Sequence, residues 1–180
     1  KALEQALLNK EIDAAVHSLK DLPCQIEDDF VLAAIPERED TSDALCGREK
    51  GHFKDLPQGA RIGTGSPRRQ AFILAARPDL KVEPIRGNID SRLRKLQEGE
   101  HPFDAVVLAL SGLKRAGLGD RMTDRLDMLP APGQGALALE CRANDEATKA
   151  CLSALDHMDT RLAAQTERQL HERLGGGCLT

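Results

Sequence analysis

Residues 61–115 read RIGTGSPRRQAFILAARPDLKVEPIRGNIDSRLRKLQEGEHPFDAVVLALSGLKR and repeat one pattern three times. In each copy a short apolar run passes into a polar turn, and the turn passes into a stretch typical of a helix. Strands that alternate with helices predict parallel β-α-β packing. We expect strands at 61–63, 82–85 and 105–110, and helices at 67–76, from 88 to about 96, and through Arg115.

Shorter apolar runs flank this region on both sides. They predict strands at 12–16, 31–35 and 136–139, with helices at 2–10, 145–155 and 160–174, the last capped by Thr160. Polar or proline-rich breakers at 36–43 and 129–135 separate the flanks from the repeated region. Two crossings of the chain, near 36–42 and 130–135, predict an α/β protein in which a second lobe is inserted into the first.

The composition limits the possible functions. The 180-residue chain has a net charge of -4, with 41% hydrophobic and 30% charged residues, as in a soluble globular protein. Four Phe and no Trp or Tyr leave few platforms for stacking bases, so nucleic acid is not an expected partner. The sequence has no apolar run long enough for a membrane span. Five Cys without a Cys-x-x-Cys pair predict neither a zinc site nor a disulfide framework, and they favour the cytoplasm.

The beginning of the chain is unusual. Lys1 is not a natural start, and the helical pattern has already begun at Ala2. We therefore expect a piece of a longer protein.

Arginines gather at the turns that follow the expected strands. Ligands of parallel sheets bind beyond the carboxyl ends of the strands, so cations at these turns predict a small ligand with several carboxylates. Arg77 stands at the far end of its helix and should face the other way. The cations expected on the binding side are Arg68, Arg69, Arg86, Arg92 and Arg115.

The sharpest local signal is Ser66-Pro67-Arg68-Arg69. Ser66 is a good N-cap and Pro67 suits the first position of a helix, whose N-terminus attracts anions. Alone, the motif fits an ordinary capped helix with two solvated arginines equally well. The arginines of the neighbouring turns favour an anion site.

The next two turns repeat this arrangement more weakly. Gly87 permits close approach of the backbone, and Asn88 can cap the helix that follows. A structural turn explains Gly87 and Asn88 well but Arg86 less well. The turn from Ser111 to Arg115 fits a short solvated helix almost as well as a binding turn.

Three residues are candidates for chemistry. An acid among cations keeps its charge and can pair with a cationic intermediate, but residue type alone favours a surface turn for Asp21. His17 is more often a structural histidine than a general base. Cys178 follows a run of glycines and could be an exposed, reactive thiol, but without further context a simple loop cysteine fits better.

Together these motifs resemble the porphobilinogen deaminase (hydroxymethylbilane synthase) family of tetrapyrrole biosynthesis. Six motifs stand in the family's order over essentially the whole chain, which makes the resemblance highly specific. They are HSLKDLP at 17–23, GTGSPRRQ at 63–70, IRGN at 85–88 with Arg92, GLKR at 112–115, PGQG at 132–135 and GGC at 176–178. The family's opening segment, with an Arg-x-Ser cluster and a glycine-rich loop, is not found here, and Gly65 replaces a serine of the family's Thr-Ser-Ser turn.

The resemblance implies three domains, of which the first two are periplasmic-binding-protein-like lobes with mixed sheets and two crossovers. Domain 1 would comprise 1–36 and 134–156, and domain 2 would comprise 41–130. Residues 158–180 would begin a small third α+β domain. We expect a cytoplasmic monomer without a nucleic-acid, membrane or metal partner.

The resemblance also implies a dipyrromethane cofactor, joined to Cys178 by a thioether, with Asp21 as the catalytic carboxylate. The cofactor would contact Ser18, Lys20, Thr64, Ser66, Arg68, Arg69, Arg86 and Gly87, and the substrate would contact Arg92, Arg115 and Gln134.

The reaction implied is that of a transferase. Porphobilinogen loses ammonia to give an electron-poor azafulvene, and the free α-carbon of the bound pyrrole chain attacks it. After four such additions, hydrolysis releases hydroxymethylbilane. Asp21 would stabilise the positively charged pyrroles and shuttle protons.

Two other functions fit part of the sequence. A non-catalytic carboxylate-binding protein with the same two lobes would explain the arginines, but it needs neither Cys178 as a covalent anchor nor Asp21 beside an anion site. An effector domain of the LysR type shares the lobes and leaves the Gly-Gly-Cys turn unexplained.

Overall fold

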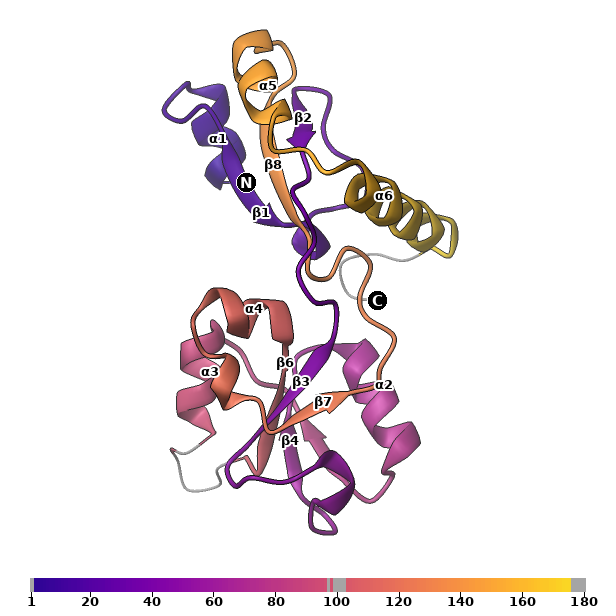
Figure 1. The fold of residues 1–180 in the computed structure, drawn as a ribbon. Helices are drawn as coiled ribbons and strands as arrows, with labels where there is room; N and C mark the ends of the chain where they lie inside the picture. The colour runs from indigo at the N-terminus through magenta and orange to yellow at the C-terminus, as the bar shows by residue number, and fades with distance from the viewer. Residues whose placement is uncertain (1, 97, 99–102, 176–180) are drawn as a thin grey trace. The chain divides into compact units, whose positions relative to one another are not determined.

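The computed structural model describes residues 2–96, 98 and 103–175. The chain forms two compact units, drawn in Figure 1. Among the described residues, one unit contains Asp40–Pro130, and the other joins the residues up to Glu39 to those from Ala131 to Gly175. The chain therefore passes from one unit to the other twice, and the predicted two-lobed α/β class is confirmed.

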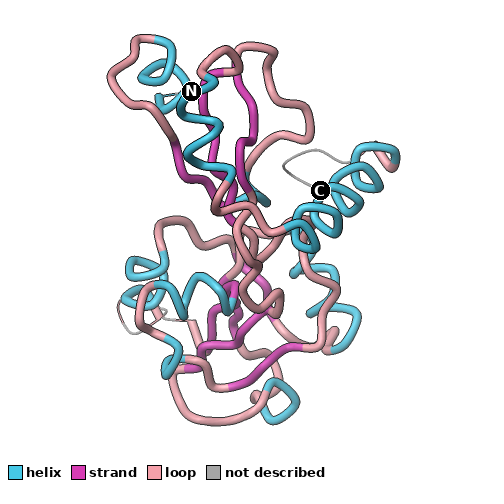
Figure 2. The backbone as a smooth tube through the Cα atoms, turned by 45° about the horizontal axis from the view of Figure 1, so that its top comes forward, coloured by secondary structure: helices cyan, strands magenta, loops and turns pink. Residues whose placement is uncertain are grey.

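The first unit is built on a three-stranded antiparallel sheet of order β1-β8-β2, magenta in Figure 2. Its elements are β1 (Ala15–Ser18), β2 (Phe30–Ala34), β8 (Leu137–Arg142), α1 (Ala2–Leu8), α5 (Glu146–Ser153) and α6 (Met158–Arg173). A 3-10 turn, η1 (Leu19–Asp21), follows β1 directly. The fully buried Leu19 anchors this turn in a core that also includes Ala164 of α6.

The second unit holds a five-stranded mixed sheet of order β5-β4-β6-β3-β7. Its strands are β3 (Asp43–Gly47), β4 (Arg61–Gly63), β5 (Lys81–Glu83), β6 (Ala105–Ala109) and β7 (Asp124–Leu126). The predicted parallel packing of the repeated unit is confirmed, because β4 pairs in parallel with both β5 and β6. Strand β3 pairs antiparallel with β6 and β7, which makes the sheet mixed.

Helices cover both faces of this sheet (Figure 1). They are α2 (Pro67–Ala76), α3 (Ile89–Lys95) and α4 (Leu110–Arg115), with 3-10 turns η2 (Phe53–Asp55) and η3 (Gly119–Arg121). Ile73 of α2 packs in a cluster with Val107, whereas Leu93 of α3 packs in a separate cluster with Val106. Successive strand residues point to opposite faces, so a strand covered on both sides must be apolar at consecutive positions, as β6 is.

The predicted caps of helices α2 and α3 are confirmed. Ser66 Oγ accepts a hydrogen bond from the Arg69 N–H at 3.4 Å. Asn88 Oδ1 accepts one from the Ser91 N–H at 2.9 Å. These side chains satisfy backbone donors that the first helical turn leaves without partners.

The predicted cap of α6 is wrong. His157 precedes the helix, and its Nδ1 accepts a hydrogen bond from the Thr160 N–H at 3.3 Å. Helix α6 therefore begins at Met158 rather than after Thr160, which is itself buried.

The strands differ from expectation where polar side chains are buried. Strand β3 was not expected at all, and it begins at Asp43, inside the expected polar breaker, where two arginines pair with this acid. Strand β8 extends to Arg142 rather than ending near 139, because Glu140 and Arg142 find partners while buried. Strand β7 occupies a stretch where no strand was expected.

Candidate functional site

In the second unit, the turns after the parallel strands β4, β5 and β6 lie at one edge of the sheet, as parallel pairing requires. The turn after β4 is held by its own hydroxyl groups. Thr64 Oγ1 accepts a hydrogen bond from the Ser66 N–H at 3.2 Å, and Ser66 Oγ caps helix α2. Thr64 is buried, so this turn is organised by the protein itself.

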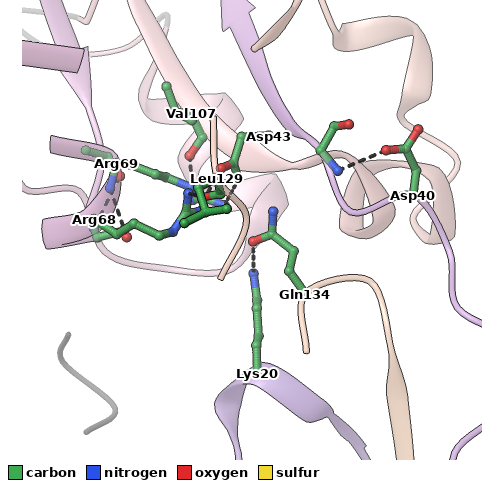
Figure 3. Close-up of polar contacts among 11 residues, drawn as sticks. Lys20, Asp40, Asp43, Arg68, Arg69, Val107, Leu129 and Gln134 are labelled. Atoms are coloured by element: carbon green, nitrogen blue, oxygen red, sulfur yellow. Dashed lines mark hydrogen bonds and ion pairs between the residues drawn. The ribbon is translucent and has the colours of Figure 1, made fainter. Parts of the chain in front are cut away.

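Arg68 and Arg69, at the start of α2, share one buried carboxylate, that of Asp43 (Figure 3). Arg69 Nε and Nη2 lie 3.0 and 2.7 Å from Asp43 Oδ1, and Arg69 Nη1 donates to the Val107 carbonyl at 2.9 Å. Arg68 Nη2 lies 2.7 Å from Asp43 Oδ2, and its Nη1 donates to the Leu129 carbonyl. Two guanidinium groups on one carboxylate leave an excess of positive charge.

The electrostatics of Arg69 extend this cluster. Arg69 is only 5% exposed. Burial lowers the pKa of its guanidinium, Asp43 opposes that shift, and the charges of Arg68 and Arg92 add to it. The charges of three predicted cations, Arg68 and Arg69 on α2 and Arg92 on α3, therefore act within one local field, which attracts an anion.

One donor of this cluster has no acceptor within the part of the chain that the structure describes. Arg68 Nε is buried and makes no hydrogen bond there. Buried donors without partners are rare because each costs desolvation free energy. Because Arg68 Nε is covered by protein, this cost belongs to the arginine cluster itself, and an incoming anion would meet the parts of the guanidinium that remain exposed.

The turn after β5 combines a cation with a special backbone. Arg86 is exposed, and Gly87 has φ +122°, a conformation that favours glycine. A Cβ on Gly87 would lie 2.9 Å from Ser91 Cβ. Arg92 Nε donates to the Gly87 carbonyl at 2.7 Å, and Lys95 Nζ donates to the Arg86 carbonyl at 2.9 Å. Two basic side chains thus brace the turn from which Arg86 projects.

The remaining predicted cations differ in position. Arg115 is exposed at the end of α4, while Ser111 is buried at its start. Arg77 binds Asp79 and backbone carbonyls that include that of Leu56, so its guanidinium has a structural role.

The first unit contributes the turn that carries Asp21. Leu19 N donates to the Ala136 carbonyl at 3.0 Å, which fixes the turn at the end of β1, where Ser18 stands. Lys20 Nζ donates to Gln134 Oε1 at 3.4 Å, also drawn in Figure 3, and Gln134 is fully buried. Asp21 is exposed, which leaves its carboxylate accessible.

The segment around Gln134 is itself tied to helix α6. Arg38 and Glu167 form two hydrogen bonds of 2.6 and 2.8 Å, and Arg38 Nε donates to the Gln134 carbonyl. Glu167 also accepts from the Gly133 N–H. Burial raises the pKa of Glu167, but the bonds from Arg38 and Gly133 outweigh it, so the pKa lies below its ordinary value. These contacts join residues of the two segments where the chain passes between units, Arg38 in one and 133–134 in the other, to helix α6 of the first unit.

The other candidates have simpler roles. His17 Nε2 lies 2.9 Å from Glu140 Oε2, and Glu140 is 1% exposed, so His17 is the partner of a buried acid. Cys178 lies outside the described residues. The described residues contain no cluster of His, Cys, Asp and Glu suited to a metal ion, and none of their helices could span a membrane.

Sequence reasoning missed Asp43. The available signal was weak: an acid directly before the apolar run Ala44-Leu45-Cys46, where an unpaired charge would be costly. Its partners are distant in sequence, so only the folded chain identifies them.

Comparison with solved structures gives the fold class. The chain matches lipoprotein Tp32 from Treponema pallidum with a TM-score of 0.56 and 20% identity, covering 98% of this chain and 81% of that one. It matches an ABC transporter periplasmic substrate-binding protein from Coxiella burnetii with a TM-score of 0.54 and 18% identity, covering 91% and 79%. The predicted periplasmic-binding-protein-like lobes are confirmed.

Sequence comparison then gives the family. The family model "Porphobilinogen deaminase, dipyromethane cofactor binding domain" matches residues 1–150. The chain is 50% identical to porphobilinogen deaminase of Brevibacillus brevis and 53% identical to that of Thermobifida fusca, over 99% and 98% of its length. The chain belongs to the porphobilinogen deaminase family, and its matched domain is named for the cofactor that the sequence predicted. It spans 58% and 56% of these two relatives.

Proposed function

We propose that this chain is the dipyrromethane-binding part of a transferase that deaminates porphobilinogen and joins four molecules head to tail into hydroxymethylbilane, in tetrapyrrole biosynthesis. Family membership supports this proposal. The arginines near the carboxyl ends of the parallel strands in the second unit also support it. The observation that carries it is the arginine pair on Asp43, in which two guanidinium groups share one carboxylate.

The donors present fit a dipyrromethane. Each of its pyrrole rings bears an acetate and a propionate, so the group is a compact polyanion. Guanidinium groups bind carboxylates through paired, charge-assisted hydrogen bonds. In the proposed site, Arg68 and Arg86 bind carboxylates directly, and Arg69 adds its charge from inside the unit. Thr64, Ser66 and Gly87 shape the turns. Ser18 and Lys20 are proposed as cofactor contacts on the family resemblance alone.

When bound, the dipyrromethane supplies a nucleophilic pyrrole carbon from which the chain grows. Arg92 and Arg115 bind incoming porphobilinogen in this proposal, and the buried Gln134 acts through its hydrogen bond from Lys20. Asp21 acts on the substrate: its exposed carboxylate accepts a hydrogen bond from the pyrrole N–H and stabilises the positive charge that develops as ammonia leaves. A carboxylate in this position can also take up the proton released when a new carbon–carbon bond forms.

Cys178 is the proposed point of attachment. A thioether suits a permanent primer because carbon–sulfur bonds resist hydrolysis. Cys178 lies five residues beyond the end of helix α6 at Arg173, so in this proposal α6 leads into the attachment loop.

Residues 158–180 are proposed to begin a third domain. Helix α6 packs on the rest of the first unit through its buried residues Thr160, Ala164 and Arg168. Its opposite side carries exposed apolar residues, namely Met158, Leu162, Leu170 and Leu174 at its end. A helix that is apolar on two sides normally packs on both, and the greater length of the relatives provides for a further domain. We also propose that the complete protein is a cytoplasmic monomer.

A non-catalytic carboxylate-binding protein is the alternative, since the fold resembles that of periplasmic binding proteins. The test is to incubate the complete protein with porphobilinogen and to follow consumption, ammonia and product together. We expect one ammonia released per porphobilinogen consumed and one hydroxymethylbilane per four. Binding of porphobilinogen without consumption or ammonia release would favour the alternative.

A further inference from the structure

Asp43 is the acid around which the arginine site is built. It is the first residue of β3, and it is 0% exposed. It pairs in the sheet with Ala109 of β6 and Leu126 of β7. The backbone of Asp43 is therefore held between two neighbouring strands of the five-stranded sheet.

The two oxygens of this carboxylate are divided between two cations. Oδ1 accepts from Nε and Nη2 of Arg69, and Oδ2 accepts from Nη2 of Arg68. Because a guanidinium is planar and its donors form a rigid fork, such bonds fix its orientation as well as its position. The two arginines also donate hydrogen bonds to backbone carbonyls, Arg69 to that of Val107 and Arg68 to that of Leu129.

The charges explain why an acid stands here. The side chains of Arg68 and Arg69 are 14% and 6% exposed, and two cations so close together in a poorly solvated place repel each other. One carboxylate reduces this repulsion yet leaves the pair with a net positive charge. Arg68 Nε keeps its donor without a partner in the described chain.

We propose that Asp43 is the positioning residue of the anion site: it holds the Arg68 and Arg69 side chains in place before a ligand arrives. Preorganised donors bind more tightly than mobile ones because their ordering has already occurred. This inference rests on the proposed function for its ligand, but the geometry of the two arginines can be measured without turnover.

The first measurement concerns that geometry. The Nε–H groups of Arg68 and Arg69 should give resolved, slowly exchanging NMR signals in the complete protein, assigned by Arg68→Lys and Arg69→Lys. In Asp43→Asn, which keeps the shape but removes the charge, both signals should broaden or exchange faster. Signals that match those of the unaltered protein would overturn the proposal, whatever the activity.

The second measurement separates positioning from simple stability. Asp43→Asn should raise the KM for porphobilinogen by about tenfold or more with a smaller change in kcat, and Asp43→Glu should recover part of the loss. The matched control is Asp124→Asn, because Asp124 also lies in the second unit, accepts hydrogen bonds from Phe53 and His52, and has no role in the site. The control should lower the melting temperature and leave KM unchanged.

Asp43→Asn leaves the buried Arg69 charge less compensated and could prevent folding. In that case Asp43→Asn combined with Arg69→Met removes both buried charges. A folded double variant should still show a mobile Arg68 Nε–H, and an unaltered Arg68 signal would overturn the proposal. The KM of this variant does not test the proposal, because the loss of the Arg69 charge raises KM by itself. Absence of turnover in the unaltered protein would count against the proposed function alone, since the NMR signals test Asp43 independently.

Discussion

Asp145 binds Arg142 through a 2.6 Å contact between Oδ2 and Nη2, while its Oδ1 accepts the Thr148 N–H at 3.0 Å and caps helix α5. Arg142 ends strand β8, and its Nη1 also donates to the Leu7 carbonyl at 2.8 Å. One carboxylate therefore links the end of the sheet to the helix that follows and, through Arg142, to helix α1.

This arrangement predicts a specific response to acid. The hydrogen bonds from Thr148 and Arg142 lower the pKa of Asp145 to about 2. An unfolded aspartate has a pKa of about 3.9. Because the folded pKa is the lower one, the stabilisation is fully present above about pH 4 and is lost as the pH falls toward 2.

Asp145→Asn tests this response, since asparagine remains a good cap but carries no charge. The unaltered protein should have the larger free energy of unfolding at pH 5, and the difference should shrink as the pH approaches 2. Urea unfolding at several pH values measures it. A difference that does not change with pH would mean that the Asp145 charge does not contribute.

Replacement of Arg86 tests whether this exposed cation, in the turn after β5, binds the ligand. Arg86→Gln removes an exposed cation while Gly87 and Asn88 keep the turn, so folding should be retained. We expect KM for porphobilinogen to rise about tenfold, as for loss of a charge-assisted hydrogen bond. Arg94→Gln is the matched control, because Arg94 is an exposed arginine on α3 that pairs only weakly with Glu98. Equal KM values for the two variants would give Arg86 a structural role.

Asp21→Asn tests catalysis. The side chain is exposed, so the melting temperature should hardly change, whereas kcat should fall at least about a hundredfold because a neutral amide cannot stabilise a cationic pyrrole. Asp28→Asn, a change to another exposed acid of the first unit, should leave kcat unaltered. Near-normal turnover by Asp21→Asn would remove Asp21 from the mechanism.

Local signals predicted much of the second unit. The bounds of β4 and α2 match the expectation, because glycine, an N-cap serine and proline mark them within a few residues. Strand β3 escaped prediction because its first residue is an acid, whose cost is offset only by arginines 25 and 26 residues later. His157 escaped as a cap because its Nδ1 is less common in that role than a hydroxyl or carboxylate.

The candidate site was also predicted only in part from the sequence. Sequence identified the cations, because arginines at successive strand ends form a visible pattern. It could not show that Arg69 is turned inward to Asp43, since that depends on packing between β3 and α2. The roles of Asp21 and Cys178 came from resemblance to a family and remain predictions.

The central claim is that this chain holds a covalent dipyrromethane at Cys178. The most direct measurement is the denatured intact mass of the complete protein, beside its Cys178→Ser variant, after incubation with porphobilinogen. We predict an added mass equal to one dipyrromethane, which survives denaturation and is absent from the variant. A folded protein whose mass stays that of the polypeptide alone, or a variant that carries the same addition, would contradict the account.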